Sequence, residues 1–211
     1  MDWSLAPNVT FCWTGGKVIF LDAARDRYLA LPDAASARFR DWLAGPASAP
    51  PFEQLTRAGL LVCDSRLAGV IEHCRVRVPD TDLDARQPDL ASCSTFAAAR
   101  AAVRARWRLK LRRFEQILSD IQSAQAGLSA AAAEDHACAY AQARRRLPLA
   151  RQCLKDSLAL LDFLTGRSIR ATLVFGVMAE PFGAHCWVQS ETAILNDSVD
   201  NVSRFTPIRA Q

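Results

Sequence analysis

The sequence predicts an α+β protein of two domains, and three observations carry this prediction. Short alternating apolar runs cluster in residues 8–31, which is typical of β-strands. Residues 64–93 are polar and lack periodicity, which indicates a connecting segment. Stretches with helical spacing begin at residue 94 and precede a second group of apolar runs. We therefore predict a domain at residues 1–80, a linker at 81–93 and a larger domain at 94–211.

The first domain is predicted to contain short strands followed by short helices. Glycine and aspartate separate the apolar runs, as tight turns require. A proline followed by aspartate is typical of a helix start, and a glycine followed by proline of a helix end. The predicted elements are strands at Val9–Trp13, Lys17–Leu21 and Arg27–Ala30, a helix from Asp33 to Gly45, a short helix through Phe52, Leu55 and Ala58, an extended segment at Gly59–Val62, and a strand or helical turn at Val70–Val76.

A long helix is predicted from Ser94 to Ile121, because apolar residues recur at helical spacing. We expect its buried stripe to contain Val103, Trp107, Leu111, Phe114, Leu118 and Ile121. Seven basic residues lie on its outer faces: Arg100, Arg104, Arg106, Arg108, Lys110, Arg112 and Arg113. They form either a solvated face or a surface that attracts an acidic segment. An alanine-rich helix at Ala130–Arg146 follows.

A cysteine at a helix start is the first candidate for chemistry. Pro148 interrupts the preceding helix, and a new helix is predicted shortly after it, ending near Gly166. Cys153 falls in the first or second turn of this helix. Free N–H groups and the helix dipole favour a thiolate there.

A histidine and an aspartate on a predicted hairpin complete the candidate site. His185–Gln189 and Ala193–Asp197 both alternate, with a three-residue turn between them. In a symmetric hairpin, His185 faces Asp197, within contact distance. A helix-start cysteine, a histidine and an orienting carboxylate together predict nucleophilic catalysis. The alternative is that Cys153 is a small buried residue and that the histidine is structural.

These residues resemble the lasso-peptide biosynthesis B proteins, which are transglutaminase-like cysteine proteases that remove the leader from a precursor peptide. The resembling segments, all within residues 147–199, are Cys153-Leu154, Ser157–Leu160, Leu173–Val177, Pro181–His185, Trp187-Val188 and Asn196-Asp197. The resemblance implies that Cys153 is the nucleophile, His185 the general base and Asp197 its orienting acid. Cys186 departs from the family, which more often has alanine, and we expect it to be buried and to face away from Cys153.

The resemblance also implies a papain/transglutaminase-like fold and two partners, the precursor peptide and an asparagine-synthetase-like cyclase. The oxyanion would be held by N–H groups at the helix start, with Gln152 contributing. The first domain resembles the winged-helix domain that recognises leader peptides, similar to the PQQ-synthesis chaperone. Its leader-binding surface is predicted at an edge strand, to which a peptide adds as a further strand. The residues of that strand are Arg27, Tyr28, Leu29 and Ala30.

Two alternatives remain open on the sequence alone. The same order of Cys, His and Asp serves acyl transfer to amines, as in transglutaminases and arylamine acetyltransferases. A winged helix is also common in DNA-binding regulators, here with a vestigial catalytic domain and with the basic helix at Arg100–Arg113 as the DNA-binding surface. The candidate recognition helix near Glu53–Arg57 carries one basic and one acidic residue, which argues against a nucleic-acid partner.

Composition excludes several other classes. Seven cysteines and three histidines show no CxxC pair or ligand spacing, so no metal and no cofactor are expected. No signal peptide is evident, no apolar run approaches the ~18 residues of a membrane span, and we expect a cytoplasmic protein. The chain has no GxxxxGK[ST] loop, so any ATP requirement would belong to the cyclase. Between residues 94 and 151, eleven Arg or Lys stand against four Asp or Glu, which indicates an acidic partner or substrate.

Overall fold

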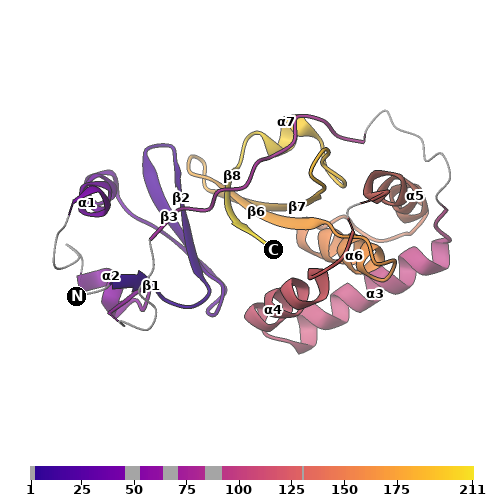
Figure 1. Ribbon diagram of the computed structural model, residues 1–211, viewed down its shortest axis with the longest axis horizontal. Coiled ribbons are helices and arrows are strands. Elements are labelled where there is room, and N and C mark those ends of the chain that lie inside the picture. The colour runs from indigo at the N-terminus through magenta and orange to yellow at the C-terminus, as the bar shows by residue number, and fades with distance from the viewer. Residues whose placement is uncertain (1–2, 46–52, 64–70, 84–91, 130) are drawn as a thin grey trace. The chain divides into compact units, whose positions relative to one another are not determined.

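The structure is a computed structural model and describes residues 3–45, 53–63, 71–83, 92–129 and 131–211. Its contacts divide the chain into two compact units. The first holds Met1–Arg75, Val177–Gly183 and Thr206–Arg209, and the second holds Val76–Gly176, Ala184–Phe205 and Ala210–Gln211. Helices and strands occur in both, so the protein is of mixed α/β class (Figure 1).

The first unit is built on two small antiparallel sheets. One has the order β2–β3–β4, and in the other β1 pairs with β5. Three phenylalanine rings, Phe11, Phe20 and Phe39, pack with centroids 5.4–5.7 Å apart in its core. The predicted strands and the helix from Asp33 are confirmed, and Phe52 lies outside the described residues. The elements are β1 (Trp3–Leu5), β2 (Val9–Thr14), β3 (Lys17–Asp22), β4 (Arg27–Ala30), α1 (Asp33–Ala44), α2 (Glu53–Arg57) and β5 (Leu61–Cys63).

Strand β4 lies at one edge of its sheet. It pairs with β3, and no other strand in the described part of the chain pairs with it. Just after β4, the Leu31 N–H donates to the Val18 carbonyl at 2.9 Å. Donors alternate in direction along an antiparallel pair. The Leu29 N–H therefore also faces β3, whereas the N–H groups of Tyr28 and Ala30 face away from the sheet.

The segment at 71–79 has neither helix nor strand, in contrast to the element predicted at Val70–Val76. Val70 itself lies outside the described residues. The Cys74 N–H donates to the Phe11 carbonyl on β2 at 3.1 Å. This segment therefore occupies part of the β2 edge, opposite β4.

Residues 76–80, which the sequence assigned to the first domain, belong to the second unit. Val76 and Val78 pack against a buried cluster of Val174, Trp187, Ile194 and Val202. Asp82 forms a parallel bridge with Ile194. The predicted linker residues 84–91 lie outside the described part of the chain.

Two helices replace the single helix predicted from Ser94 to Ile121: α3 (Thr95–Leu111) and α4 (Phe114–Gln125). The Ser94 hydroxyl caps α3 by accepting the Ala97 N–H at 3.1 Å. Arg112 and Arg113, between the two helices, have extended backbone. The apolar spacing continues unbroken across these two residues, so periodicity gave no sign of the interruption.

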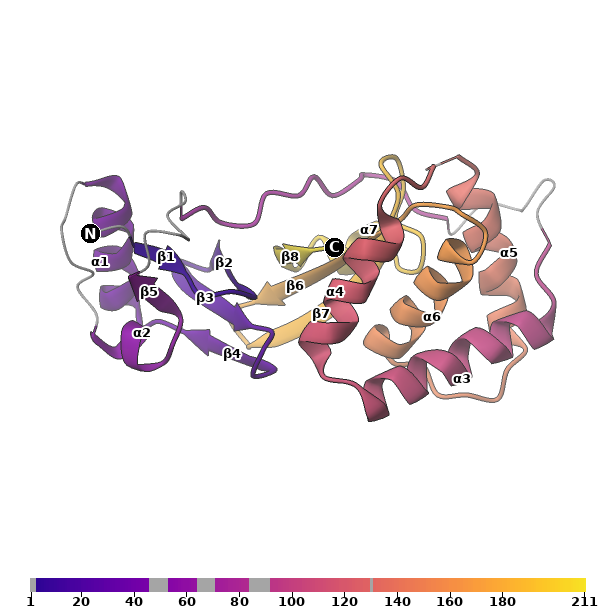
Figure 2. The same ribbon diagram turned by 60° about the horizontal axis from the view of Figure 1, so that its bottom comes forward.

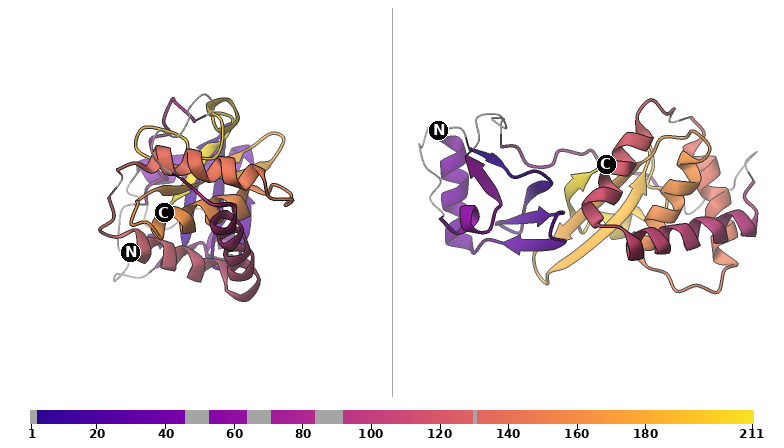
Figure 3. Two further views of the ribbon diagram at one scale, coloured as in Figure 1. Left: turned by 90° about the vertical axis from the view of Figure 1, so that its right-hand side faces the viewer. Right: turned by 90° about the horizontal axis from the view of Figure 1, so that it is seen from below.

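The buried face of α3 also differs from the predicted stripe. Val103, Trp107 and Leu111 are 49, 54 and 71 % exposed. The buried residues of this helix are Ala98, Ala101, Ala102 and Ala105. Alanines allow α3 to approach α6 (Cys153–Thr165), against which it packs extensively (Figure 3). The prediction placed the largest apolar residues in the core, whereas the close helix pair buries the smallest. In α4 the predicted Leu118 and Ile121 are buried.

Several basic residues of α3 and its end are held by ion pairs. Arg104 and Arg108 both contact Asp162 on α6. Arg112 pairs with Asp120 on α4. This part of the predicted basic surface therefore serves helix packing within the unit.

A third sheet has the order β7–β6–β8, formed by β6 (Thr172–Met178), β7 (Gly183–Gln189) and β8 (Thr206–Ala210). Helices α3 to α6 lie on one side of it, and α7 (Val199–Val202) lies on the other (Figures 1 and 2). Residues 198–211, for which the sequence predicted no element, thus supply a helix and a strand. Within the described ranges, no helix combines the length and apolar character that a membrane crossing needs.

Candidate active site

Cys153 is the first residue of α6, which agrees with its predicted place in the first or second turn. The N-cap residue, Gln152, has extended backbone and makes no side-chain capping bond. The first N–H groups of a helix lack partners within it, and together with the helix dipole they favour negative charge. A thiol in this position is therefore predisposed to ionise.

A buried arginine at the end of α5 (Ala133–Arg145) fixes the backbone that leads into α6. Arg144 Nε donates to the Asp156 carboxylate at 2.8 Å, and its Nη2 donates to the Leu149 carbonyl at 3.1 Å. The other Asp156 oxygen accepts the backbone N–H of Gln152 at 2.9 Å. Hydrogen bonds that share partners in this way favour one geometry. The position of the thiol thus depends on two side chains that are not part of the predicted triad.

The predicted histidine and carboxylate are in contact. Nε2 of His185, on β7, hydrogen-bonds a carboxylate oxygen of Asp197. Asp197 Oδ1 accepts the Ser198 N–H at 2.8 Å, and Asn201 Nδ2 lies 3.1 and 3.0 Å from the two carboxylate oxygens. Because Nε2 faces the carboxylate, Nδ1 is the ring nitrogen left for Cys153.

Two aromatic rings confine the imidazole of His185. The Trp187 centroid lies 6.2 Å from it in a stacked arrangement, and the Phe205 centroid lies 5.1 Å away. Trp187 is fully buried, and its ring lies so close to β6 that a Cβ on Gly176 would approach it to 2.7 Å. The absence of a side chain at Gly176 therefore gives the tryptophan the space in which it supports the histidine.

The hairpin predicted at the end of β7 is wrong in its second strand. A single bridge forms, Gln189 to Ile194, and it is shifted by one residue from the predicted register. Beyond it, the Val188 N–H donates to the side-chain oxygen of Asn196 at 2.7 Å. An asparagine that captures a backbone N–H competes with a strand ladder. The chain therefore leaves the strand, and Asp197 reaches the imidazole from a loop.

Cys186 is buried, 3 % exposed, but the prediction that it faces away from Cys153 is wrong. Cys186 and Cys153 line the same cavity, and each thiol shifts the pKa of the other. The Ser157 hydroxyl on α6 donates to the Cys186 carbonyl at 3.3 Å. This bond holds the strand against the first turns of α6, so the residue after the histidine faces the helix that Cys153 begins.

Hydrogen bonds in the site favour an ion pair between thiolate and imidazolium. The hydrogen bond from Cys186, followed by that from His185, lowers the pKa of Cys153 to about 4. The hydrogen bond to Asp197, followed by that to Cys153, raises the pKa of His185 to about 9. Burial raises the pKa of Asp197, but the hydrogen bonds from His185, the Ser198 N–H and Asn201 outweigh it and lower that pKa. The interaction with Cys153, followed by burial, raises the pKa of the Cys186 thiol, so it remains protonated as a donor.

Cys153 opens into a cavity of about 270 Å³ that Gln152, Tyr140 and Leu160 also line. Gln152 is thus in the same cavity as the thiol, where the sequence predicted an oxyanion ligand. The predicted leader-binding residues Arg27, Tyr28, Leu29 and Ala30 form β4 in the first unit. They do not line this cavity.

Sequence reasoning missed the residues that hold the triad in place. Arg144 and Asp156 gave no signal, because neither belongs to a spacing that chemistry requires, and Ser157 was only part of a resembling segment with no role assigned to it. Asn201 had a weak signal: it follows Asp197 by one helical turn, a separation at which side chains meet. These residues hold the side chains of Cys153, His185 and Asp197 in one arrangement.

One comparison with known proteins identifies the family of the C-terminal part of the chain. The model of the transglutaminase-like superfamily matches residues 96–210, which include Cys153, His185 and Asp197. No curated protein and no solved structure matches the chain. The family match covers more than half of the chain, and it spans the helices and the sheet around the thiol. The chain therefore belongs to the transglutaminase-like superfamily.

Proposed function

We propose that this protein is a cysteine peptidase that removes the leader from a ribosomally made lasso precursor peptide. The observation that carries the proposal is that Cys153, His185 and Asp197 line one cavity, where Asp197 is hydrogen-bonded to the imidazole and the pKa of Cys153 is lowered. A thiol ionised at neutral pH beside an imidazolium has the components of acyl transfer through a thioester.

The proposed reaction begins with attack of the Cys153 thiolate on the scissile carbonyl. The oxyanion lies near the free N–H groups that open α6, with Gln152 as a further donor. The imidazolium of His185 then gives its proton to the departing amine, which leaves an acyl-thioester. In the second half, neutral His185 takes a proton from water, the hydroxide displaces the thiolate, and the carboxylic acid product leaves. Asp197 stabilises the imidazolium in both halves.

Leader recognition is assigned to the first unit. The outward N–H group of Ala30 on edge strand β4 supports this assignment, because a peptide strand can pair with it. The resemblance of the N-terminal elements to a leader-binding winged helix points the same way. In this proposal the released core peptide passes to an asparagine-synthetase-like cyclase.

An amine acyltransferase remains the second candidate, because the superfamily match and the thiolate site serve it equally well. The two differ only in what attacks the acyl-thioester, water or an amine. The DNA-binding alternative loses support, since Arg57, the basic residue of α2, pairs with Glu53 at 2.8 Å.

The deciding experiment incubates the purified chain with the precursor peptide encoded beside its gene and analyses products by mass spectrometry. Two free fragments, absent with the Cys153→Ala variant, support the peptidase. A parallel sample contains a high concentration of a primary amine. An amide adduct as the main product there, with little hydrolysis without amine, would instead establish the acyltransferase.

A further inference from the structure

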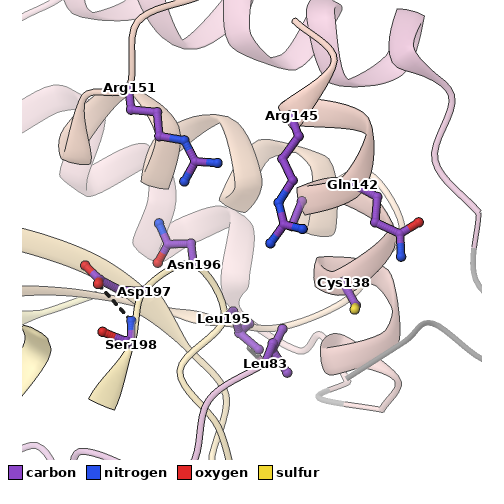
Figure 4. A pocket seen from close by; sticks show the side chains of 10 residues that line it. Leu83, Cys138, Gln142, Arg145, Arg151, Leu195, Asn196, Asp197 and Ser198 are labelled. Atoms are coloured by element: carbon purple, nitrogen blue, oxygen red, sulfur yellow. Dashed lines mark hydrogen bonds between the residues drawn. The ribbon is translucent and has the colours of Figure 1, made fainter. Parts of the chain in front are cut away.

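A second cavity, of about 340 Å³, adjoins the one that holds the thiol. Ala141, Arg151, Asn196 and Asp197 line both cavities. A substrate chain bound across Cys153 would therefore have a neighbouring side chain within reach of the second cavity. Figure 4 shows its walls: the end of α5, the segment before α6 and the loop after β7.

Two arginines give this cavity a positive charge. Arg145 extends from the end of α5 and Arg151 from the segment before α6, and Figure 4 shows both guanidinium groups directed toward the space above Asn196. Neither arginine pairs with an acid in the part of the chain that the structure describes. Arg144 is different, because its guanidinium is bound to Asp156 and to backbone carbonyls. The two cavity arginines are thus available to an external anion.

The acidic residue in the cavity wall does not neutralise them. Asp197 is bonded to His185, the Ser198 N–H and Asn201, so its oxygens are already engaged. The remaining polar groups of the wall include the amide of Gln142, which can accept or donate hydrogen bonds. Two guanidinium groups directed toward one space can both donate hydrogen bonds to the oxygens of a carboxylate.

We infer that this cavity is a substrate subsite that binds the carboxylate of an aspartate or glutamate close to the bond at Cys153. The inference rests on the proposed function, because it names a feature of the peptide that the site would cleave. Arg151 lies in both cavities and contacts the acid nearest the thiol, and Arg145 contacts it from the far wall.

Helix-end electrostatics offers a competing explanation for these arginines, since cations stabilise the last turn of a helix. Arg146 provides a matched control, because it is the C-cap of α5, is exposed and does not line the cavity. Arg146→Gln removes the same charge from the same helix end. An effect of the Arg145 and Arg151 variants that Arg146→Gln does not share can therefore be attributed to the cavity.

The first test does not require a peptide substrate. Iodoacetate and iodoacetamide alkylate a thiolate in the same way, by displacement of iodide, but only iodoacetate carries a carboxylate. Their rates at Cys153 are measured near pH 6, where ordinary thiols are protonated, and the modified residue is identified by mass spectrometry. We expect Arg151→Gln to lower the iodoacetate-to-iodoacetamide ratio about three- to tenfold, the size of one nearby charge in partly solvated surroundings. Arg146→Gln should leave it unchanged, and an unchanged ratio in Arg151→Gln overturns the inference.

The second test uses cleavable peptides in which aspartate or its isostere asparagine is placed at each position near the scissile bond. At one position, wild-type kcat/KM should favour aspartate about tenfold, and both Arg145→Gln and Arg151→Gln should remove that preference. The Arg145→Glu variant should instead favour lysine there. Equal rates for aspartate and asparagine at every position overturn the inference while leaving the peptidase intact. If no peptide is cleaved, the proposed function fails, and the alkylation ratio still decides whether the cavity binds anions.

Discussion

The start of α6 and the strand β4 hold their functional groups in opposite ways. Around Cys153, side chains contact side chains: a thiol, an imidazole and a carboxylate are fixed by Cys186, Asn201 and others. On β4, the group proposed to bind the leader is a backbone N–H, that of Ala30, which faces away from β3. We therefore expect the site at Cys153 to lose activity when a single side chain is replaced. Leader binding at β4 should weaken only when the backbone is changed.

The largest effect is expected at the nucleophile. Cys153→Ala removes the sulfur that forms the acyl-thioester, so peptide cleavage should become undetectable by mass spectrometry. Binding of a fluorescent leader should stay within about twofold of wild type, because binding is assigned to the first unit. Cys63→Ala, which removes an exposed thiol from β5, is the control and should cleave normally. Cleavage by Cys153→Ala at the wild-type rate would remove the assigned nucleophile.

The next largest effect is expected at the carboxylate. Asp197→Asn is isosteric but cannot stabilise the imidazolium, and we expect kcat to fall about 10⁴-fold, as in other triads whose acid becomes an amide. Circular dichroism should show an intact fold. Asp200→Asn, in the neighbouring α7, removes the same charge from an exposed position and should have little effect. If Asp197→Asn keeps its rate, another group orients His185.

The pH dependence of activity tests the ionisation of Cys153 and His185. Because the pKa of Cys153 is lowered to about 4 and that of His185 is raised to about 9, activity should fall as pH drops through the first value and as it rises through the second. Cys186→Ala removes a hydrogen bond to the thiolate, which should move the acidic limb upward by about one pH unit. The rate of iodoacetamide alkylation against pH measures this limb directly. An unmoved limb would show that Cys186 does not stabilise the thiolate, and Cys63→Ala is again the control.

The smallest effect is expected at the edge strand. Ala30→Pro removes an outward N–H and should weaken leader binding about two- to tenfold, as the loss of one hydrogen bond would. Leu29→Pro instead removes an N–H that faces β3, so it should destabilise the module by about 1–3 kcal/mol. Fluorescence anisotropy measures binding, and thermal unfolding separates the two variants. If folded Ala30→Pro binds like wild type, the leader does not pair with this edge.

The sequence was informative where chemistry restricts the residue type. Cys153, His185 and Asp197 could be selected from the sequence because few other residue types suit the proposed chemistry, and the helix start at Cys153 follows from Pro148. The hairpin register was not identifiable, because Asn196 replaces a backbone acceptor with its side chain. Nor was the role of Cys186, because strand alternation alone does not show which helix covers which face.

Packing was predicted least well in α3. Its large apolar residues followed helical spacing, yet the helix buries its alanines against α6. A periodic pattern shows that a face is apolar, but not which partner the face meets or how closely. The ion pair of Arg108 with Asp162 likewise joins positions that are far apart in the chain, and local spacing carries no information about such pairs.

The close approach of Trp187 to Gly176 restricts how this protein can change over generations. A substitution of Gly176 by alanine would push the tryptophan ring and Phe205, and through them the imidazole of His185. A single step from Trp187 to a smaller residue would leave a cavity beside the same imidazole. Each substitution should be tolerated only together with the other, because the two side-chain volumes share one space. Related chains should therefore vary at both positions together or at neither.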